Sequence, residues 1–206
     1  MIFSFKTIQA PTEGNYKEKG SKFLSFAYPV RSEEEVKQRI GELKKKYFDA
    51  RHHCFAYMLG ADETRFRAFD DGEPNHSAGD PILGQIKSKN ITNVLIVVVR
   101  YFGGVKLGVG GLISAYKAAA EDALNRCVII EKEILQGYVI EYPYVSTPDV
   151  MKLVKEFDLV MHNQSFEEEC KMEVSISIRS RTLFKQKVQL LNVLGVKIFI
   201  KEIPLP

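Results

Sequence analysis

The sequence lacks the cysteine patterns that hold small secreted domains together or bind zinc. Its 206 residues include three cysteines, Cys54, Cys127 and Cys170, which are odd in number and widely spaced. Such a set excludes a disulfide framework. No Cys-x-x-Cys pair is present, so a structural zinc site is not expected. A chain of this length can bury a core without covalent support, and it fits two small domains.

Long apolar runs are also missing. The longest, Val94–Val99, has the length of a strand, whereas a membrane helix needs about 20 apolar residues. Residues Met1–Ala10 mix Phe, Ser, Lys and Gln, and they lack the apolar block and cleavage site of a signal peptide. We therefore expect a soluble cytoplasmic protein with no membrane partner.

Acidic residues are absent from the stretch 81–120, which carries five basic ones. These are Lys87, Lys89, Arg100, Lys106 and Lys117. The preceding stretch, 62–80, holds six acidic residues and two arginines. The net charge of +3 is too small to prove a nucleic-acid partner. The abrupt change of sign favours a polarised surface, although chance and solvated faces explain it about equally well.

Periodicity and turn residues predict an α+β domain over residues 1–130. Ser32 and Glu35 form a capping box that starts a helix, and Asp70–Asp80 and Tyr101–Gly111 have the composition of loops. The other predicted elements are strands at Phe23–Val30, His53–Leu59, Arg65–Phe69 and Val94–Val99, and helices at Pro81–Lys87 and Leu112–Cys127.

A boundary is predicted near Val128–Glu133, followed by a second domain over residues 134–206. Its predicted order is β-α-β-β-α-β, the ferredoxin-like pattern. The strands are expected at Leu135–Tyr144, Asn163–Glu168, Lys171–Arg179 and Val196–Ile203, and the helices at Pro148–Val160 and Thr182–Leu194. Thr147 is the expected N-cap of the first helix and Gly195 the C-cap of the second. Nine basic and nine acidic residues leave this domain neutral, so the net positive charge belongs to the first domain.

The strongest functional feature is the stretch 100–116, RYFGGVKLGVGGLISAY. Glycine lets a ligand approach the backbone closely, a helix start offers free N–H groups, and Arg100 and Lys106 add full charges. The pattern predicts a site for a phosphate, a nucleotide or a nucleic-acid backbone. The alternative is a tight turn whose glycines permit packing alone, and the Gly-Lys-Ser/Thr of a Walker A loop is absent. The five glycines are Gly103, Gly104, Gly108, Gly110 and Gly111.

The acidic loop is a weaker candidate. Asp70, Asp71 and Glu73 place three carboxylates within four residues. They could hold a hard cation such as Mg²⁺, or they could serve acid–base chemistry. Turn formation by Asp, Gly and Pro is the simpler interpretation.

The run Arg51-His52-His53-Cys54 is a third candidate. In a strand, His52 and Cys54 share one face and His53 takes the other. Proximity of His and Cys could create a nucleophile, but a buried structural cysteine is favoured. No catalytic residue is assigned.

Together these stretches resemble the IMPACT family, in its bacterial YigZ-like branch. The resemblance covers essentially the whole chain, and it implies a first domain, 1–130, of the IMPACT type. That domain would be similar to the second domain of a small-subunit ribosomal protein, a β-sheet with helices on one face. It implies a second domain, 134–206, similar to the ferredoxin-like fifth domain of elongation factor G. The shared motifs are SKF (21–23), ARHHCFAYMLGA (50–61), DDGEP (70–74), AGDPIL (78–83) and the glycine-rich stretch.

The resemblance also implies a role. Eukaryotic members are linked to translational control through an extra N-terminal domain, for which we expect no room here, and bacterial members are associated with RNA or ribosomes. Two departures matter. The small residues that usually follow DDGEP are replaced by Asn75-His76-Ser77. Ser77 keeps a hydroxyl, whereas the larger Asn75 and His76 would narrow a binding groove beside this loop. The neutral second domain argues against nucleic-acid binding by charge.

We therefore predict a protein that regulates translation by contacting phosphates of RNA, of the ribosome or of a nucleotide through the glycine loop. No aromatic-rich platform for a single strand is visible in the motifs, so base-specific readout is not predicted. One alternative is a nucleotide-dependent enzyme similar to small-molecule kinases, with Asp70, Asp71 or Glu73 holding Mg²⁺. Another is a protein-interaction module.

Overall fold

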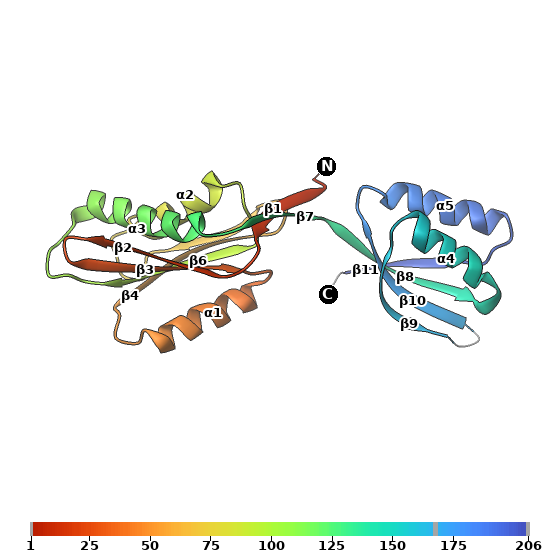
Figure 1. The fold of residues 1–206 in the computed structure, drawn as a ribbon, viewed down its shortest axis with the longest axis horizontal. Coiled ribbons are helices and arrows are strands. Elements are labelled where there is room, and N and C mark those ends of the chain that lie inside the picture. Colours follow the sequence, from red (N-terminus) through yellow and green to blue (C-terminus); the bar gives the residue numbers. More distant parts are fainter. Residues whose placement is uncertain (1, 167–168, 205–206) are drawn as a thin grey trace. The chain divides into compact units, whose positions relative to one another are not determined.

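The structure is a computed structural model that describes residues 2–166 and 169–204. It is a mixed α+β protein, as predicted, and it divides into two compact units (Figure 1). One unit contains residues 2–132, and the other begins at Glu133. In the described residues no helix is both long enough and apolar enough to cross a bilayer.

The first unit is built on an antiparallel sheet of five strands in the order β2-β3-β6-β4-β5. Their bounds are Thr12–Glu18 for β2, Ser21–Pro29 for β3, Val94–Tyr101 for β6, His52–Leu59 for β4 and Arg65–Phe69 for β5. The apolar run of β6 is buried, because the strand is central and covered on both faces. The four strands predicted between Phe23 and Val99 are confirmed.

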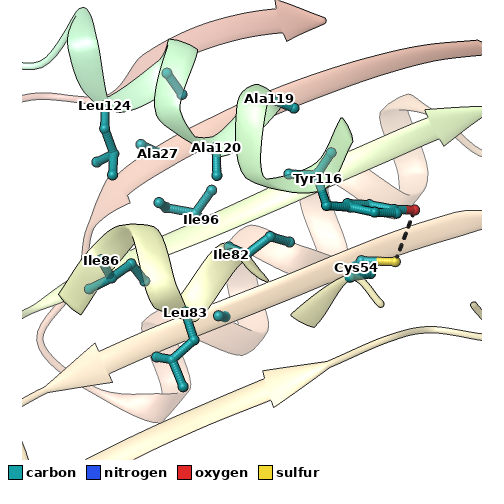
Figure 2. Packing of buried hydrophobic residues seen from close by; sticks show 14 of the residues in the cluster. Ala27, Cys54, Ile82, Leu83, Ile86, Ile96, Tyr116, Ala119, Ala120 and Leu124 are labelled. Atoms are coloured by element: carbon teal, nitrogen blue, oxygen red, sulfur yellow. Dashed lines mark hydrogen bonds between the residues drawn. The ribbon is translucent and has the colours of Figure 1, made fainter. Parts of the chain in front are cut away.

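Helices cover both faces of this sheet, which corrects the expectation of helices on one face. Helix α1 (Glu33–Lys46) packs Val36 and Leu43 into a core on one side, and α2 (Gly79–Ser88) and α3 (Gly108–Asn125) share a core on the other (Figure 1). The physical reason is the alternation of β3, β4 and β6, whose successive residues are apolar toward both faces. Figure 2 shows the α2 and α3 side, where side chains of both helices meet those of the sheet.

Helix α1 begins as the capping box predicts. The Ser32 hydroxyl accepts a hydrogen bond from the Glu35 N–H at 3.3 Å, and the Glu35 carboxylate accepts one from the Arg31 N–H at 2.8 Å. Helix α3, in contrast, begins at Gly108 rather than at the predicted Leu112. The four residues 108–111 therefore belong to the helix and not to the loop. Burial of Leu112, Ala115 and Tyr116 anchors this turn and overrides its low helix propensity.

Two short strands were not predicted. β1 (Ser4–Ile8) pairs with β7 (Ile129–Glu133) in a sheet of their own, and β7 occupies the predicted boundary segment. β2 was also not predicted, because its charged residues and Gly14 are untypical of a strand. A Cβ on Gly14 would lie 2.6 Å from the Ala123 nitrogen, so glycine is what allows α3 to pack this closely on β2.

The second unit follows the order β8-α4-β9-β10-α5-β11 with an antiparallel sheet in the order β11-β8-β10-β9. Its helices share one core with the sheet, built around Tyr138, Ile140, Met172 and Phe184. The bounds are Leu135–Pro143 for β8, Tyr144–Ser146 for the 3₁₀ turn η1, Thr147–Glu156 for α4, Val160–Ser165 for β9, Glu169–Ser177 for β10, Arg181–Val193 for α5 and Phe199–Ile203 for β11.

Several bounds of this unit differ from the predictions. β9 begins at Val160 rather than Asn163, and β11 begins at Phe199 rather than Val196. Thr147 is the first helical residue rather than the N-cap, because its hydroxyl donates to the Tyr144 carbonyl at 2.6 Å. Helix α4 ends at Glu156 instead of Val160, and Asp158 turns the chain with a φ of 49°. Gly195 follows α5 with a φ of 90°, as a C-terminal glycine should. Residues 167–168 of the predicted strand Asn163–Glu168 lie outside the described residues.

Candidate functional site

A buried polar cluster joins the acidic loop, β6 and α3. The Glu73 carboxylate oxygen Oε1 accepts hydrogen bonds from Arg100 Nη1 at 2.6 Å and from the Tyr116 hydroxyl at 2.7 Å. Glu73 is 8% exposed and Arg100 6%, so this ion pair is screened from water. The Cys54 thiol donates to the Asp70 carbonyl at 2.9 Å and approaches the Tyr116 hydroxyl at 3.3 Å (Figure 2). The cluster therefore positions three segments that are distant in sequence.

Cys54 behaves as a structural residue. Burial raises the pKa of its thiol, and the hydrogen bond with Tyr116 offsets this only in part. His52 lies on the same strand, but its Nδ1 atom lies 2.9 Å from the Asp71 carbonyl oxygen. A protonated, fully buried thiol is a poor nucleophile. This arrangement supports the structural interpretation of Cys54 over a His–Cys pair.

Arg100 lies between two aromatic rings. Its guanidinium carbon is 5.5 Å from the centre of the Phe23 ring and 5.6 Å from that of Phe102. Phe23 is fully buried, whereas Phe102 is 55% exposed. The sequence analysis predicts that the charge of Arg100 contacts a phosphate. In the structure this charge is paired with Glu73 and lies next to the exposed Phe102 ring.

The acidic loop directs its carboxylates to separate partners within the protein. Asp70 accepts hydrogen bonds from the backbone N–H groups of His76, Ala78 and Gly79 at 2.8–3.0 Å, where α2 begins. Partial burial opposes ionisation of Asp70, but the three N–H donors together hold its pKa below the usual value. Asp71 accepts from the His53 N–H at 2.7 Å and lies 3.8 Å from Lys44 Nζ.

This loop does not fit the Mg²⁺ site considered for it. Asp70, Asp71 and Glu73 each have different protein partners, and in the described chain no group of three or more His, Cys, Asp or Glu residues could hold a metal ion. Asp71 and Gly72 both have positive φ, 44° and 86°, and the Glu73 N–H donates to the Asp70 carbonyl at 3.0 Å. These features are those of a tight turn with both central residues left-handed.

The other candidate residues near the acidic loop also contact the protein itself or point into solvent. Ser77 is buried, and its hydroxyl donates to the Pro74 carbonyl at 2.6 Å. His53 is 5% exposed, and burial lowers its pKa. The His76 side chain is 81% exposed and contacts Asp80 at 2.6 Å, so it points outward.

The glycines of the loop differ in what they do. Gly103 packs against the hairpin turn between β2 and β3, and a Cβ there would lie 1.9 Å from the Gly20 carbonyl carbon. Gly104 and Gly108 have φ values of 89° and 70°, which favour glycine. Gly111 leaves 3.1 Å between an added Cβ and Leu107, and Gly110 has open space around it. Packing therefore explains Gly103, and backbone conformation explains Gly104 and Gly108.

The contact at Gly103 brings in lysines that the sequence analysis missed. Lys17 and Lys22 lie directly opposite each other in the β2–β3 register, and Lys22 is in turn opposite Tyr101. Lys19 lies in the hairpin turn with a φ of 46°. We call Lys17, Lys19, Lys22 and Lys106 the loop lysines. All four are exposed, and within the described residues none is in ion-pair contact with a carboxylate. The lysine-rich run YKEKGSK at 16–22 is the sequence signal that could have indicated three of them.

Three other lysines are less close to the loop. Lys89 donates to Asn125 at 3.0 Å, at the far end of α3, and Lys87 lies over the Phe66 ring at 4.7 Å. Since α3 has 18 residues, its two ends are about 26 Å apart. Lys117 is exposed in the third turn of α3.

Comparisons with known proteins agree with the resemblance. The family model described as the Impact N-terminal domain matches residues 19–124. IMPACT family member YvyE of Bacillus subtilis is 28% identical over 186 residues, covering 90% of this chain and 86% of the relative. IMPACT family member YigZ of Escherichia coli is 30% identical over 172 residues, covering 82% and 84%. A crystal structure of a hypothetical protein matches over 100% of both chains with a TM-score of 0.75 and 27% identity.

Proposed function

The chain belongs to the IMPACT family, and from this premise we propose that it binds RNA or ribosomes through phosphate contacts and takes part in regulating translation. The observation that carries the proposal is the contact of Gly103 with the β2–β3 hairpin turn, which brings the exposed Lys19 to the loop that carries the exposed Lys106. Lys17 and Lys22 follow on the same hairpin, on the α1 face of the sheet. We also propose that the first unit is related to the ribosomal-protein domain and the second to the elongation-factor domain named above.

The register of β2 and β3 supports an anionic ligand. Like charges directly opposite in a sheet are destabilising, by about 0.2–1 kcal/mol for a typical cross-strand pair. Lys17 and Lys22 are such a pair, and no carboxylate of the described residues neutralises them. A phosphate backbone would relieve their repulsion. The lack of acidic residues from 81 to 120 leaves the adjoining loop without competing negative charge.

The loop backbone can contribute as well. Helix α3 begins at Gly108 without a side-chain cap, so N–H groups of its first turn are open to a ligand. Gly108 and Gly110 are exposed, which leaves room for an anion beside Lys106. In this arrangement Arg100 supports the loop from beneath, and Lys106 makes the direct contact.

The proposal is tested by titrating fluorescein-labelled RNA with the protein at several salt concentrations and following anisotropy. We expect affinity to fall steeply with salt, and Lys106→Ala to lower the slope of log K against log salt by about 1. The matched control is Lys89→Ala, which removes an equal charge at the other end of α3. Absence of RNA binding at low salt, or equal losses in both variants, would contradict the proposal.

A nucleotide-dependent enzyme is less well supported, because each carboxylate that would hold its metal already has a protein partner. A thermal melt with millimolar Mg-ATP distinguishes the nucleotide-dependent enzyme from the RNA-binding protein. A bound nucleotide raises the melting temperature according to RT ln(1 + [L]/Kd), whereas the RNA proposal predicts no specific shift.

A further inference from the structure

We propose that Phe102 is a stacking platform for an unpaired nucleobase, which makes single-stranded RNA the preferred ligand of this surface. The inference rests on the proposed function and deepens it. It starts from an exposed aromatic ring that the phosphate contacts leave unexplained. Phe102 follows the end of β6 directly, and the residue is 55% exposed although it adjoins a buried cluster.

The ring is supported from below. The Arg100 guanidinium lies 5.6 Å from its centre, and the same group lies 5.5 Å from the centre of the buried Phe23 ring. Arg100 is held in turn by Glu73, which also accepts a hydrogen bond from the Tyr116 hydroxyl. A ring resting on a fixed cation loses less freedom when a ligand binds than a ring on a mobile loop would. The buried ion pair thereby acquires a role in binding as well as in folding.

The surroundings of Phe102 match a nucleic acid strand better than a protein surface. Gly103 contacts the hairpin turn that carries Lys19, and Lys106 lies four residues after Phe102 in the loop. Apolar side chains, Val105 at 51% and Val109 at 53% exposed, are interleaved with these cations. Alternation of positive charge with an aromatic face is the arrangement that binds single strands, in which phosphates meet lysines and bases meet rings.

The preference for unpaired bases follows from the geometry of stacking. In a duplex each base face is covered by its neighbours, so an exposed phenylalanine offers a duplex little beyond contact with its backbone. Every base has a π face, and one ring therefore binds without reading sequence. The proposal departs from the sequence analysis, which saw no aromatic-rich single-strand platform, but it keeps the expectation that bases are not read by sequence.

The test compares Phe102→Leu with Phe48→Leu by anisotropy on a labelled 12-nucleotide oligouridylate, on an RNA duplex of equal length and in competition with inorganic polyphosphate. Phe48 is a matched control because it is 83% exposed in the same unit and stacks on no other ring in the described part of the chain. We expect Phe102→Leu to weaken single-strand binding about five-fold or more. The inhibition constant of polyphosphate, which has no bases, should be the same for Phe102→Leu and the wild type, and Phe102→Tyr should retain most of the wild-type affinity for the single strand.

The outcomes separate this inference from the proposed function. Equal effects of Phe102→Leu and Phe48→Leu, with Lys106→Ala still weakening binding, would overturn the stacking role and leave the phosphate contacts standing. Equal affinity of the wild type for the duplex and the single strand would also overturn the stacking role and leave the phosphate contacts standing. If the wild type binds no RNA at low salt, both proposals are wrong, and the exposed ring with its lysines is then a surface for a protein.

Discussion

Two loops meet the buried ion pair of the first unit, and they use their side chains in opposite ways. In the loop 70–78, Asp70, Asp71, Glu73 and Ser77 all bond to atoms of the protein itself. In the loop 102–107, Phe102, Val105 and Lys106 are exposed, and Lys106 has no carboxylate partner among the residues that the structure describes. The loop that is rich in ionisable groups is therefore structural, and the loop that is rich in glycine is the one open to a ligand.

The difference teaches that charge in a sequence does not show whether a side chain serves the fold or is free for the ligand that we propose. A buried carboxylate must be paired, so the acidic loop is committed to folding. Glycines carry no chemistry, but they let the loop pack on the hairpin and expose the groups between them. Variants of the acidic loop should change stability, and variants of the glycine loop and its lysines should change binding.

The largest effect is expected from Glu73→Ala. It leaves the Arg100 guanidinium buried without its counter-charge, which typically destabilises a protein by about 3–5 kcal/mol. Urea denaturation followed by circular dichroism measures this change. The double variant Glu73→Leu/Arg100→Met should lose less than Glu73→Ala, because apolar residues replace the whole pair. If Glu73→Ala lowers the free energy of unfolding by less than the exposed control Glu121→Ala does, the Glu73–Arg100 pair is not buried as described.

Gly103→Ala should have the next largest effect. An added Cβ would overlap the Gly20 backbone, and relief of such overpacking costs about 1–3 kcal/mol. The matched control is Gly110→Ala, where a Cβ meets nothing within 4 Å and φ is not positive. Alanine there should stabilise the protein by about 0.4–1 kcal/mol. The two changes in unfolding free energy should thus have opposite signs, and equal signs would contradict the close contact of loop and hairpin.

Asp70→Asn tests the acidic loop through pH. Asp70 bonds three N–H groups near the start of α2 through both carboxylate oxygens. Asparagine keeps one acceptor oxygen but loses the charge and the other acceptor, so we expect a loss of about 1 kcal/mol. Because folding lowers the pKa of Asp70, its contribution is complete above the unfolded pKa and is lost as pH falls through the folded pKa. Urea titrations from pH 7 downward should show the difference between wild type and variant shrinking below about pH 4. A difference that is constant with pH would exclude this role of the carboxylate.

Much of the first sheet could be predicted because its signal is local. The continuous apolar run 94–99 indicates a central strand, and the Ser32–Glu35 spacing indicates a helix start. What failed depends on contacts distant in sequence. β1 and β7 are each five residues long and gain their structure from pairing with each other. The side of the sheet that α1 covers is likewise set by packing, which no periodicity within the helix reveals.

The candidate site was predicted in part for the same reason. The glycine loop and Lys106 are visible as a motif. The pairing of Glu73 with Arg100 and Tyr116 spans 27 and 43 residues, so spacing alone assigned Arg100 to a ligand and Glu73 to a metal. Lys17 and Lys22 become neighbours only through the register of a hairpin whose first strand was missed.

The smallest change in stability is the most informative about function. Lys17→Glu places opposite charges across the β2–β3 pair and should raise the unfolding free energy by about 0.2–1 kcal/mol. The same substitution removes one phosphate contact and adds a repulsive charge, so RNA affinity at low salt should fall by more than in Lys17→Gln. Urea denaturation and anisotropy on the same samples measure both quantities. A gain in stability with unchanged RNA affinity would remove the lysine pair from the binding surface, whereas a gain in stability with weaker binding would show that this repulsion is retained for an anionic ligand.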